Sequence, residues 1–524
     1  MKRRVFLRRI FGLTATGAVW APRITQGQAK PERPNILLIH TDQHRLDCLG
    51  AYGNQQVKTP NIDALASDGV RFNNSFCSFP VCTPSRYSLI SGLYVREHGG
   101  YSNHCTLRPN VDTFPAMLKN AGYKTKAVGK MHYTPTYFNA GFAEMELAEQ
   151  DGPGRWDDDY HRYLRAQGLV DYNDLEDQVG EYRKNAPPSY FATCGANASN
   201  LADPYHSTTW IGDRAVESIG NWGNDQPNFL MVGFIKPHHP FDPPQPWAAI
   251  YDPDKTDILP GWTDACFEHD LAKNKGYFPH TQLTKPMLKR VTAHYYAGIT
   301  HIDHHVGRML RLLKQRKLYD NTMIIFTSDH GEYLGFHHLL LKGNYMYDPL
   351  AKVPLIIKYH GNEDQGKVSN DLVSNIDLAP TILRAAGLKP ARKMRGQDLA
   401  INTSPRRILI AENDRGTVMA RTHSMKLIVV MDKHNPVHGL LFNMENDPLE
   451  KNNLYADPTY QNDRIQLLSA IQSWLTDSPA QDLYCNQQAP QISQPNVPPL
   501  DLSHRNDMIE YFKAAMQRPA KGTG

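Results

Sequence analysis

The chain has 524 residues, of which 40% are hydrophobic and 21% are charged, and its formal net charge is +4. This composition is typical of a globular enzyme. The sequence contains no basic tract of the kind that binds nucleic acid, and no segment after the N-terminus is long and apolar enough to span a membrane. We therefore expect neither a nucleic-acid partner nor stable membrane insertion.

The N-terminus resembles a twin-arginine export signal. Arg3 and Arg4 precede Phe6 and Leu7, and the stretch 10–21 is modestly apolar. Residues 1–29 are therefore predicted to be a twin-arginine-type signal peptide, with cleavage after residue 21 or residue 29. The twin-arginine export machinery would carry the folded protein out of a bacterial cytoplasm, to the periplasm or beyond. The alternative is a basic N-terminus that carries no targeting signal.

Short apolar runs alternate with helical patterns over the next 300 residues. In chain order the predicted elements are a strand at 34–40, helices at 61–69, 85–91 and 115–122, strands at 126–128 and 229–235, a helix at 286–318 and a strand at 323–327. Strands that alternate with helices indicate an α/β fold, with a large and mostly parallel sheet flanked by helices.

Two regions depart from this alternation. Residues 144–206 are polar and aromatic, which predicts an insertion or lid over one end of the sheet, within a catalytic domain at 30–400. Residues 401–524 are predicted to form a smaller subdomain and tail. Its antiparallel sheet is expected from segments 407–411, 417–421 and 426–431, its helix from 465–475, and an extended tail from 487–499.

The chain has seven cysteines, and an odd number in an exported protein points to one special thiol. Cys82 is the candidate, since it lies at the start of a predicted helix, where free backbone N–H groups favour an anion. The other six cysteines either pair or stay reduced. They lack the C-x-x-C spacing that is typical of a thiolate zinc site.

Polar residues follow four of the predicted strands. Because sites in open α/β sheets form at the carboxyl ends of strands, residues far apart in the sequence are expected to meet there. These residues are Asp42, Gln43, Lys130, His132, His238, Asp329 and His330.

Several ordered motifs resemble the sulfatase family, the formylglycine-dependent branch of the alkaline-phosphatase-like superfamily. The first is C-x-P-S-R at 82–86, and the second is G-Y-K-T-K-A-V-G-K-M-H at 122–132. They are followed by K-P-H-H-P-F at 236–241, T-S-D-H-G-E at 327–332, Lys342, and a closing motif within 441–454.

This resemblance implies hydrolysis of sulfate esters by a formylglycine that a formylglycine-generating enzyme makes from Cys82. The hydrated aldehyde would supply one hydroxyl to attack the ester and a second to expel the sulfate. The implied substrate is a sulfated small molecule or glycan. Export and a segment rich in Trp, Tyr and Asp favour a sulfated carbohydrate.

The resemblance also implies one divalent cation, usually calcium. Its ligands would be Asp42, Gln43, Asp329, His330 and an oxygen of modified Cys82. Many family members have Asp where this chain has Gln43, and Asn where it has His330. One carboxylate fewer and one nitrogen donor leave Mn²⁺ or Mg²⁺ open.

By the same resemblance, Arg86, Lys130 and Lys342 would bind the anion and neutralise its charge. His132 would be the base that restores the aldehyde, and His238 the group that protonates the leaving oxygen. His239 is adjacent, but the Pro-His-x-Pro spacing favours His238.

The remaining histidines form two groups. The first group is expected on a polar helix face rather than at a metal, and consists of His294, His301, His304 and His305. The second group, His337 and His338, is open between a pocket lining and a loop role.

Two other functions stay open. A phosphonate monoester or phosphodiester hydrolase of the same superfamily is compatible with Gln43 and His330, although Pro84-Ser85-Arg86 resembles the sulfatase form more closely. The second is a catalytically inactive protein that binds sulfated glycans with an unmodified thiol at Cys82.

Overall fold

The apolar run Asn35–Asp42 forms β1, a fully buried strand inside an eight-stranded sheet. The computed structural model describes residues 33–150, 158–178, 192–273, 280–362, 364–401, 405–414, 416–432, 435–492, 506–511 and 514. The predicted signal peptide, residues 1–29, lies outside these residues. The sheet belongs to the unit that begins at Pro34.

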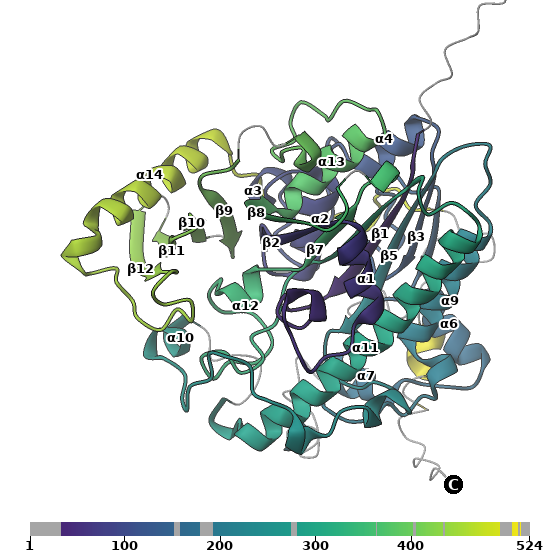
Figure 1. Cartoon of the computed structure of the whole chain (residues 1–524), viewed down its shortest axis with the longest axis horizontal. Helices are drawn as coiled ribbons and strands as arrows, with labels where there is room; N and C mark the ends of the chain where they lie inside the picture. The colour runs from purple at the N-terminus through teal and green to yellow at the C-terminus, as the bar shows by residue number, and fades with distance from the viewer. Residues whose placement is uncertain are drawn as a thin grey trace, which may run out of the picture. The chain divides into compact units, whose positions relative to one another are not determined.

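The strand order of this sheet is β4-β3-β5-β1-β6-β7-β2-β8 (Figure 1). Strand β7 is antiparallel to both of its neighbours, and all other neighbouring pairs are parallel. This confirms the predicted fold class. The other strands are β2 (Val70–Phe76), β3 (Lys124–Gly129), β4 (Glu144–Leu147), β5 (Asn228–Pro237), β6 (Thr322–Ser328), β7 (Leu355–Lys358) and β8 (Lys367–Ser374).

Helices cover both faces of the sheet, because successive side chains of a strand point to opposite faces. In β1, Leu37 and Ile39 join one hydrophobic cluster, while Ile36 and Leu38 join the other. The first face is covered by α1 (Pro60–Asp68), α9 (Ser207–Gly220) and α11 (Lys285–Gln315). The second is covered by α2 (Cys82–Ser91), α4 (Phe114–Asn120) and α13 (Leu378–Ala385).

The remaining helices are shorter or lie outside these two layers. They are α3 (Val95–His98), α6 (Asp159–Ala166), α7 (Tyr172–Gln178), α10 (Glu268–Lys273), α12 (Asp348–Ala351) and α14 (Gln461–Asp477). Among the helices of the described residues, none is both long and apolar enough to cross a membrane.

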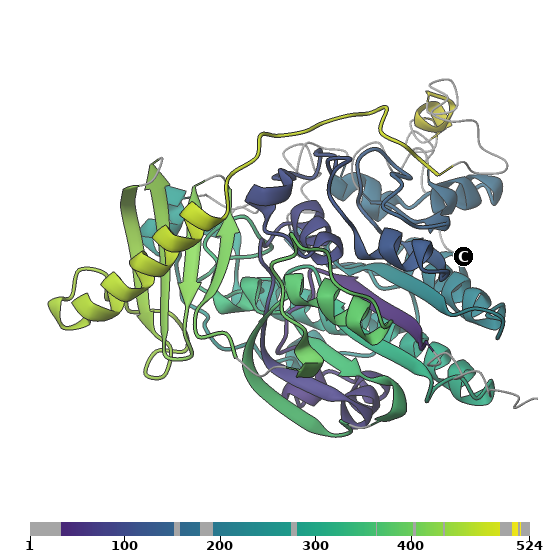
Figure 2. The same cartoon turned by 90° about the horizontal axis from the view of Figure 1, so that it is seen from above.

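A second, four-stranded antiparallel sheet follows in the C-terminal part, in the order β12-β11-β10-β9 (Figure 2). Its strands are β9 (Leu409–Asn413), β10 (Thr417–Arg421), β11 (Met425–Asp432) and β12 (Asn435–Asn443). One face packs against Trp474 of α14, and the other packs against Phe336 and Tyr347. The smaller sheet is therefore joined by apolar contacts to the loop between β6 and β7.

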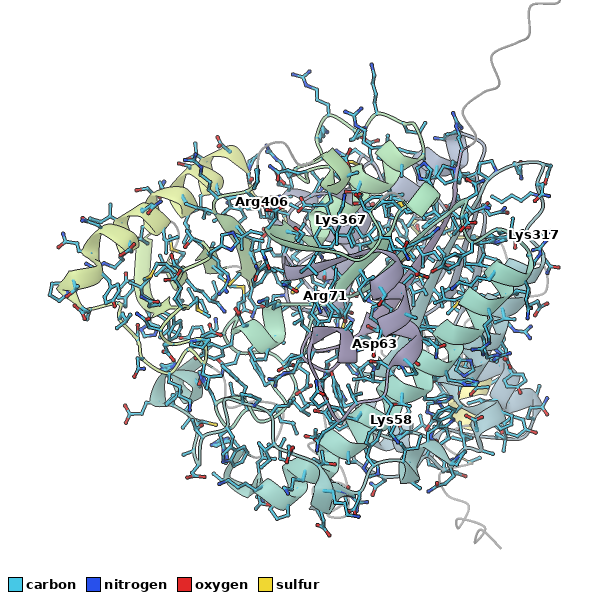
Figure 3. The ribbon with its side chains drawn as sticks, in the orientation of Figure 1. Lys58, Asp63, Arg71, Lys317, Lys367 and Arg406 are labelled. Atoms are coloured by element: carbon cyan, nitrogen blue, oxygen red, sulfur yellow. The ribbon has the colours of Figure 1, made fainter. Side chains whose placement is uncertain are left out.

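Arg406, which precedes β9 (Figure 3), links the smaller sheet electrostatically to the start of α13. Its Nη2 lies 2.7 Å from Oδ1 of Asp377. The Asp377 side chain is fully buried. A buried carboxylate needs such a partner, because burial without one is costly.

Several predicted boundaries shift in the structure. The helix predicted from 61 begins at Pro60, and its first N–H groups bond to Asp303 of α11 rather than to a cap at Asn61. The helix predicted from 85 already begins at Cys82. Residues 144–147, the start of the segment predicted as an insertion, form β4 at the edge of the main sheet.

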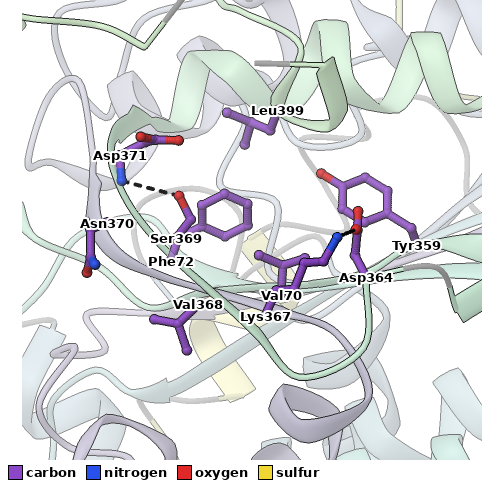
Figure 4. A pocket seen from close by; sticks show the side chains of 10 residues that line it. All are labelled: Val70, Phe72, Tyr359, Asp364, Lys367, Val368, Ser369, Asn370, Asp371 and Leu399. Carbon is purple, nitrogen blue, oxygen red and sulfur yellow. Dashed lines mark hydrogen bonds and ion pairs between the residues drawn. The ribbon is translucent and has the colours of Figure 1, made fainter. Parts of the chain in front are cut away.

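The opposite edge of the sheet, β8, borders a cavity of about 370 Å³. Val70, Tyr359 and Lys367 are among its lining residues (Figure 4). None of the predicted site residues lies among the residues that line it. Most of the predicted site residues lie instead at the carboxyl ends of the central strands.

We predict that Asp303→Ala destabilises the protein by about 3 kcal/mol, because two backbone N–H groups and the Asn61 amide lose their buried acceptor. Asp303→Asn keeps an acceptor oxygen and should lose less than half as much. Urea unfolding measures both, with the exposed Asp112→Ala as a control expected to stay within about 0.5 kcal/mol. An Ala variant as stable as its Asn counterpart would contradict the capping role.

Candidate active site

Four neighbouring strands, β3, β5, β1 and β6, end at one edge of the sheet and bring their terminal residues together. Asp42 ends β1, Lys130 follows β3, His238 follows β5 and Asp329 follows β6. All four side chains are buried. The carboxyl ends of parallel strands thus assemble residues that are almost 300 positions apart.

Cys82 is the first residue of α2, and its side chain points into this cluster. Its Sγ lies 3.3 Å from Nε2 of His330, 3.2 Å from Nζ of Lys342 and 3.7 Å from Oδ1 of Asp42. The residue is 1% exposed. The helix start adds a positive end of the helix dipole to the positive charge around Sγ.

Arg86, one turn further along α2, lies between the two carboxylates. Its Nη2 is 3.0 Å from Oδ2 of Asp42, its Nε donates to Oδ2 of Asp329 at 3.0 Å, and its Nη1 donates to the carbonyl of Lys130. Each of its three guanidinium nitrogens therefore bonds to protein oxygen. The structure places Arg86 as the buried counter-ion of the carboxylates.

Neighbouring cations control whether Asp42 and Asp329 are ionised. Burial favours the neutral form of Asp42, but the positive charges of Lys130, Arg86 and Lys342 hold the pKa of Asp42 well below its usual range. Burial and the charge of Asp42 also favour the neutral form of Asp329, but its pKa is lowered overall, with the positive charge of Arg86 among the causes. Both side chains are thus negative in the folded protein.

Asp42, Cys82, Asp329 and His330 form a cluster whose ligand atoms all lie within 4.8 Å of one another. Nδ1 of His330 is 2.9 Å from the carbonyl of Gly331. Because a carbonyl only accepts, Nδ1 carries the proton, and Nε2 keeps its lone pair toward the cluster. Two carboxylates and an imidazole nitrogen suit a divalent cation.

The Gln43 side chain is oriented toward the same point. Its Nε2 donates to the buried carboxylate of Glu332, which leaves Oε1 facing the ammonium of Lys342 at 3.0 Å. Gln43 also has a positive φ of 62°, which turns the chain away from the end of β1. Glu332 therefore decides which end of the amide faces the cluster.

Lys342 contacts three of the five predicted metal ligands. Its Nζ lies against Oε1 of Gln43, Sγ of Cys82 and Nε2 of His330. These donor atoms therefore accommodate a positive charge in this structure.

Lys342 also binds His238, with Nζ 3.0 Å from Nε2. Nδ1 of His238 lies 2.6 Å from the carbonyl of His239 and so carries the proton of the neutral ring. Burial and the neighbours His239, Lys342 and Lys130 hold the pKa of His238 well below its ordinary value. The proton between these two groups therefore resides on Lys342, whose Nζ donates a hydrogen bond to Nε2 of His238.

Lys130 and His132 lie in the segment that follows β3. Nζ of Lys130 is 2.8 Å from Oδ2 of Asp42, and the Thr83 hydroxyl donates to the carbonyl of His132 at 2.6 Å. Gly129 makes this placement possible. With φ of +88°, its missing Cβ would lie 2.1 Å from the carbonyl oxygen of Gly233 on β5.

Two residues after β4 support this half of the site and were missed in the sequence analysis. Glu149 accepts from the backbone N–H groups of Met131 and His132. Gln150 accepts from Lys130 at 3.3 Å and donates to the carbonyl of His239 at 2.7 Å. They follow β4 as Lys130 and His132 follow β3, so recognising β4 as a strand would have found them.

Helix α7 holds the His238–His239 turn from outside. Oδ2 of Asp177 lies 2.5 Å from Nδ1 of His239, and Oδ1 of Asp174 accepts from Gln150. The segment predicted to be a lid therefore contributes buried groups that support the site.

The other histidines have structural partners. His301 lies 3.1 Å from Asp203 and stacks on Trp247, where α11 packs against the segments around it. His337 contacts the carbonyl of Leu449, and both ring nitrogens of His338 lie against carbonyl oxygens. These contacts favour the structural alternative for all three residues.

Comparison with known proteins agrees with this geometry. The sulfatase family model matches residues 34–388. The chain is 31% identical over 469 residues to an arylsulfatase of Clostridium perfringens, covering 84% of this chain and 93% of that protein. It is 25% identical over 504 residues to an N-acetylglucosamine-6-O-sulfatase of Bacteroides thetaiotaomicron, with 85% and 88% covered.

A solved structure, the phosphonate monoester hydrolase of Agrobacterium radiobacter, has a TM-score of 0.74 to this chain. The identity is 26%, and 85% of this chain and 96% of that chain are covered. The family model spans more than half of the protein and contains every predicted site residue. The chain belongs to the sulfatase family, whose members are sulfuric ester hydrolases.

Proposed function

We propose that this sulfatase hydrolyses sulfate esters of carbohydrates, with a formylglycine made from Cys82 as nucleophile and one divalent cation, calcium in the first place. The observation that carries the proposal is the position of Cys82. Its Sγ lies at the start of α2, within 3.3 Å of both His330 and Lys342, and beside the ionised Asp42. A nucleophile at this point lies beside the Lys342 ammonium group and the positive end of the α2 dipole, and both favour attack on an anionic ester.

The side chains around Cys82 have separate tasks in this proposal. A cation held by Asp42, Gln43, Asp329 and His330 would withdraw charge from the sulfate oxygens when bound. When oxidised and hydrated, residue 82 would supply one hydroxyl for attack and one for release of the sulfate. Lys130 and Lys342 would neutralise charge on the sulfuryl oxygens.

In this proposal His238 and His132 carry out the proton transfers. The Lys342–His238 pair would deliver one proton to the alcohol oxygen as the S–O bond breaks, since Nζ and Nε2 are 3.0 Å apart. His132 would later take the proton of the second hydroxyl, so that the sulfate leaves and the aldehyde returns. Arg86 would act indirectly, by keeping Asp42 and Asp329 ionised and in place.

A carbohydrate substrate is supported by the similarity to the N-acetylglucosamine-6-O-sulfatase. The similarity to a phosphonate monoester hydrolase, together with Gln43 and His330, supports a second candidate within the superfamily. We also propose that residues 1–29 export the folded protein to the periplasm or beyond. Modification by a formylglycine-generating enzyme would then precede export.

A substrate panel tests the activity. We expect release of sulfate from N-acetylglucosamine 6-sulfate and from 4-nitrophenyl sulfate, with turnover of a phenylphosphonate ester at least about 100-fold lower in kcat/KM. Cys82→Ala should abolish all hydrolysis. A preference for the phosphonate ester would favour the second candidate, and undiminished hydrolysis by Cys82→Ala would contradict the proposed nucleophile.

The proton-donor role predicts a dependence on the leaving group. His238→Ala should lower kcat on a sugar sulfate by about 10²–10⁴-fold, because an alkoxide is a poor leaving group without protonation. On 4-nitrophenyl sulfate, whose phenol is acidic, the loss should be below about tenfold. The exposed His423→Ala is the matched control and should leave both rates unchanged. Equal losses on both substrates would assign His238 to binding instead.

Removal of the metal is predicted to act on both activity and stability. Dialysis against EDTA should lower activity at least about tenfold and also lower the melting temperature, because Asp42 and Asp329 lose a counter-ion. Calcium, manganese and magnesium are then added back separately, and the calcium form should recover most activity. Asp329→Asn should not respond to EDTA in either measurement. A wild-type protein that loses neither activity nor thermal stability would contradict the metal site.

A further inference from the structure

The chain after α14 crosses the molecule as an extended strap, residues 478–492 (Figure 2). At its far end, Asn139 N–H donates to the carbonyl of Pro490 at 2.8 Å, and Ile492 N–H donates to the carbonyl of Tyr137. The strap therefore joins the C-terminal helix to the catalytic part by backbone hydrogen bonds.

The middle of the strap lies beside the loop at 102–108. Arg108 Nη2 donates to the carbonyl of Asp482, and Thr106 N–H donates to the carbonyl of Tyr484, both at 2.8 Å. Cys105 and Cys485 are the chain neighbours of Thr106 and Tyr484, two residues that are hydrogen-bonded to each other.

A disulfide requires Cα atoms about 4.4–6.8 Å apart, a separation that the chain neighbours of a hydrogen-bonded pair can reach. Sγ of Cys485 lies 3.2 Å from the carbonyl of His104, next to Cys105. Burial and, after it, the charge and hydrogen bond of the Cys105 thiol raise the pKa of Cys485, so the two side chains interact directly. Both are thiols in this structure.

Only Cys485 faces solvent. Cys105 is 1% exposed and contacts the Ser102 hydroxyl at 3.3 Å, whereas Cys485 is exposed. An oxidising agent can therefore reach Cys485 first, and Cys105 is then positioned to resolve the mixed disulfide.

The loop that carries Cys105 also contacts the segments that carry Cys82 and His132. Oδ1 of Asn103 accepts from the N–H of Thr83, the residue after Cys82, at 3.2 Å. The carbonyl of Asn103 accepts from Thr134, two residues after His132, at 3.1 Å. A covalent link at position 105 would therefore hold the strap against a loop that contacts both segments of the active site.

We propose that Cys105 and Cys485 form a disulfide that fastens the C-terminal strap to the active-site loop. An oxidising protein or low-molecular-weight disulfide accepts the two electrons and two protons, and becomes two thiols. One S–S bond forms in the sulfatase as one S–S bond of the oxidant breaks. The proposal does not depend on the identity of the substrate.

Peptide mapping tests the link on the full-length protein. After incubation with oxidised glutathione, iodoacetamide and trypsin, we expect one peptide pair joining the segment after Arg96 to the segment 465–505. Its mass should be the sum of the two peptides less two hydrogen atoms, and reduction should separate them. Cys485→Ser should abolish the pair, and the half-buried Cys266→Ser should retain it. Alkylation of both Cys105 and Cys485 in the oxidised wild type would overturn the proposal.

Limited proteolysis tests the clamp separately from catalysis. Leu483 is 48% exposed, so thermolysin can cut the strap there when it lifts from the loop. Oxidation should slow this cut about tenfold in the wild type and in Cys266→Ser, and should not change it in Cys485→Ser. An oxidised wild type that is cut as fast as Cys485→Ser would show that no link restrains the strap.

Discussion

The buried contact of Arg86 with Asp42 and Asp329 is the interaction on which the site depends. One guanidinium joins the ends of β1 and β6 to α2, the helix that begins with Cys82. All three side chains are completely buried, so removing one partner would leave an unpaired charge in a medium of low polarity. The position of Cys82 relative to the carboxylates is thus set by the same contact that keeps them ionised.

Around this centre, several predicted site residues are held by residues from other parts of the chain. Glu332 orients the amide of Gln43, and Gln150 joins Lys130 to the His238–His239 turn. The smaller sheet packs on Phe336 and Tyr347, on either side of Lys342. By this contact the smaller sheet stabilises the loop that carries Lys342.

Much of this arrangement could be predicted from the sequence, because the central strands are long apolar runs that end in polar motifs. The edge strand β4 and the inner strands β7 and β2 were missed for physical reasons. β2 reads V-R-F-N-N-S-F, with few apolar residues, and β4 and β7 have only four residues each. Without β4, the role of Glu149 and Gln150 was not visible.

Other features depend on contacts between segments far apart in the sequence. Arg86 was predicted to bind the anion, but no local pattern shows that its three nitrogens are engaged by protein oxygens. Likewise, the position of Lys342 beside the metal ligands follows from how its loop packs. The pairing of Cys105 with Cys485 depends on where the C-terminal strap lies, which no periodicity predicts.

The mass of the tryptic peptide 72–86 tests the central claim most directly. It contains Cys77 and Cys82, so Cys77 serves as an internal control in the same molecule. After coexpression with a formylglycine-generating enzyme and alkylation, the account predicts one alkylated cysteine at 77. At position 82 it predicts an aldehyde, whose mass is that of the unmodified cysteine minus H₂S plus one oxygen atom. Alkylated thiols at both positions in enzyme that still cleaves sulfate esters would contradict it.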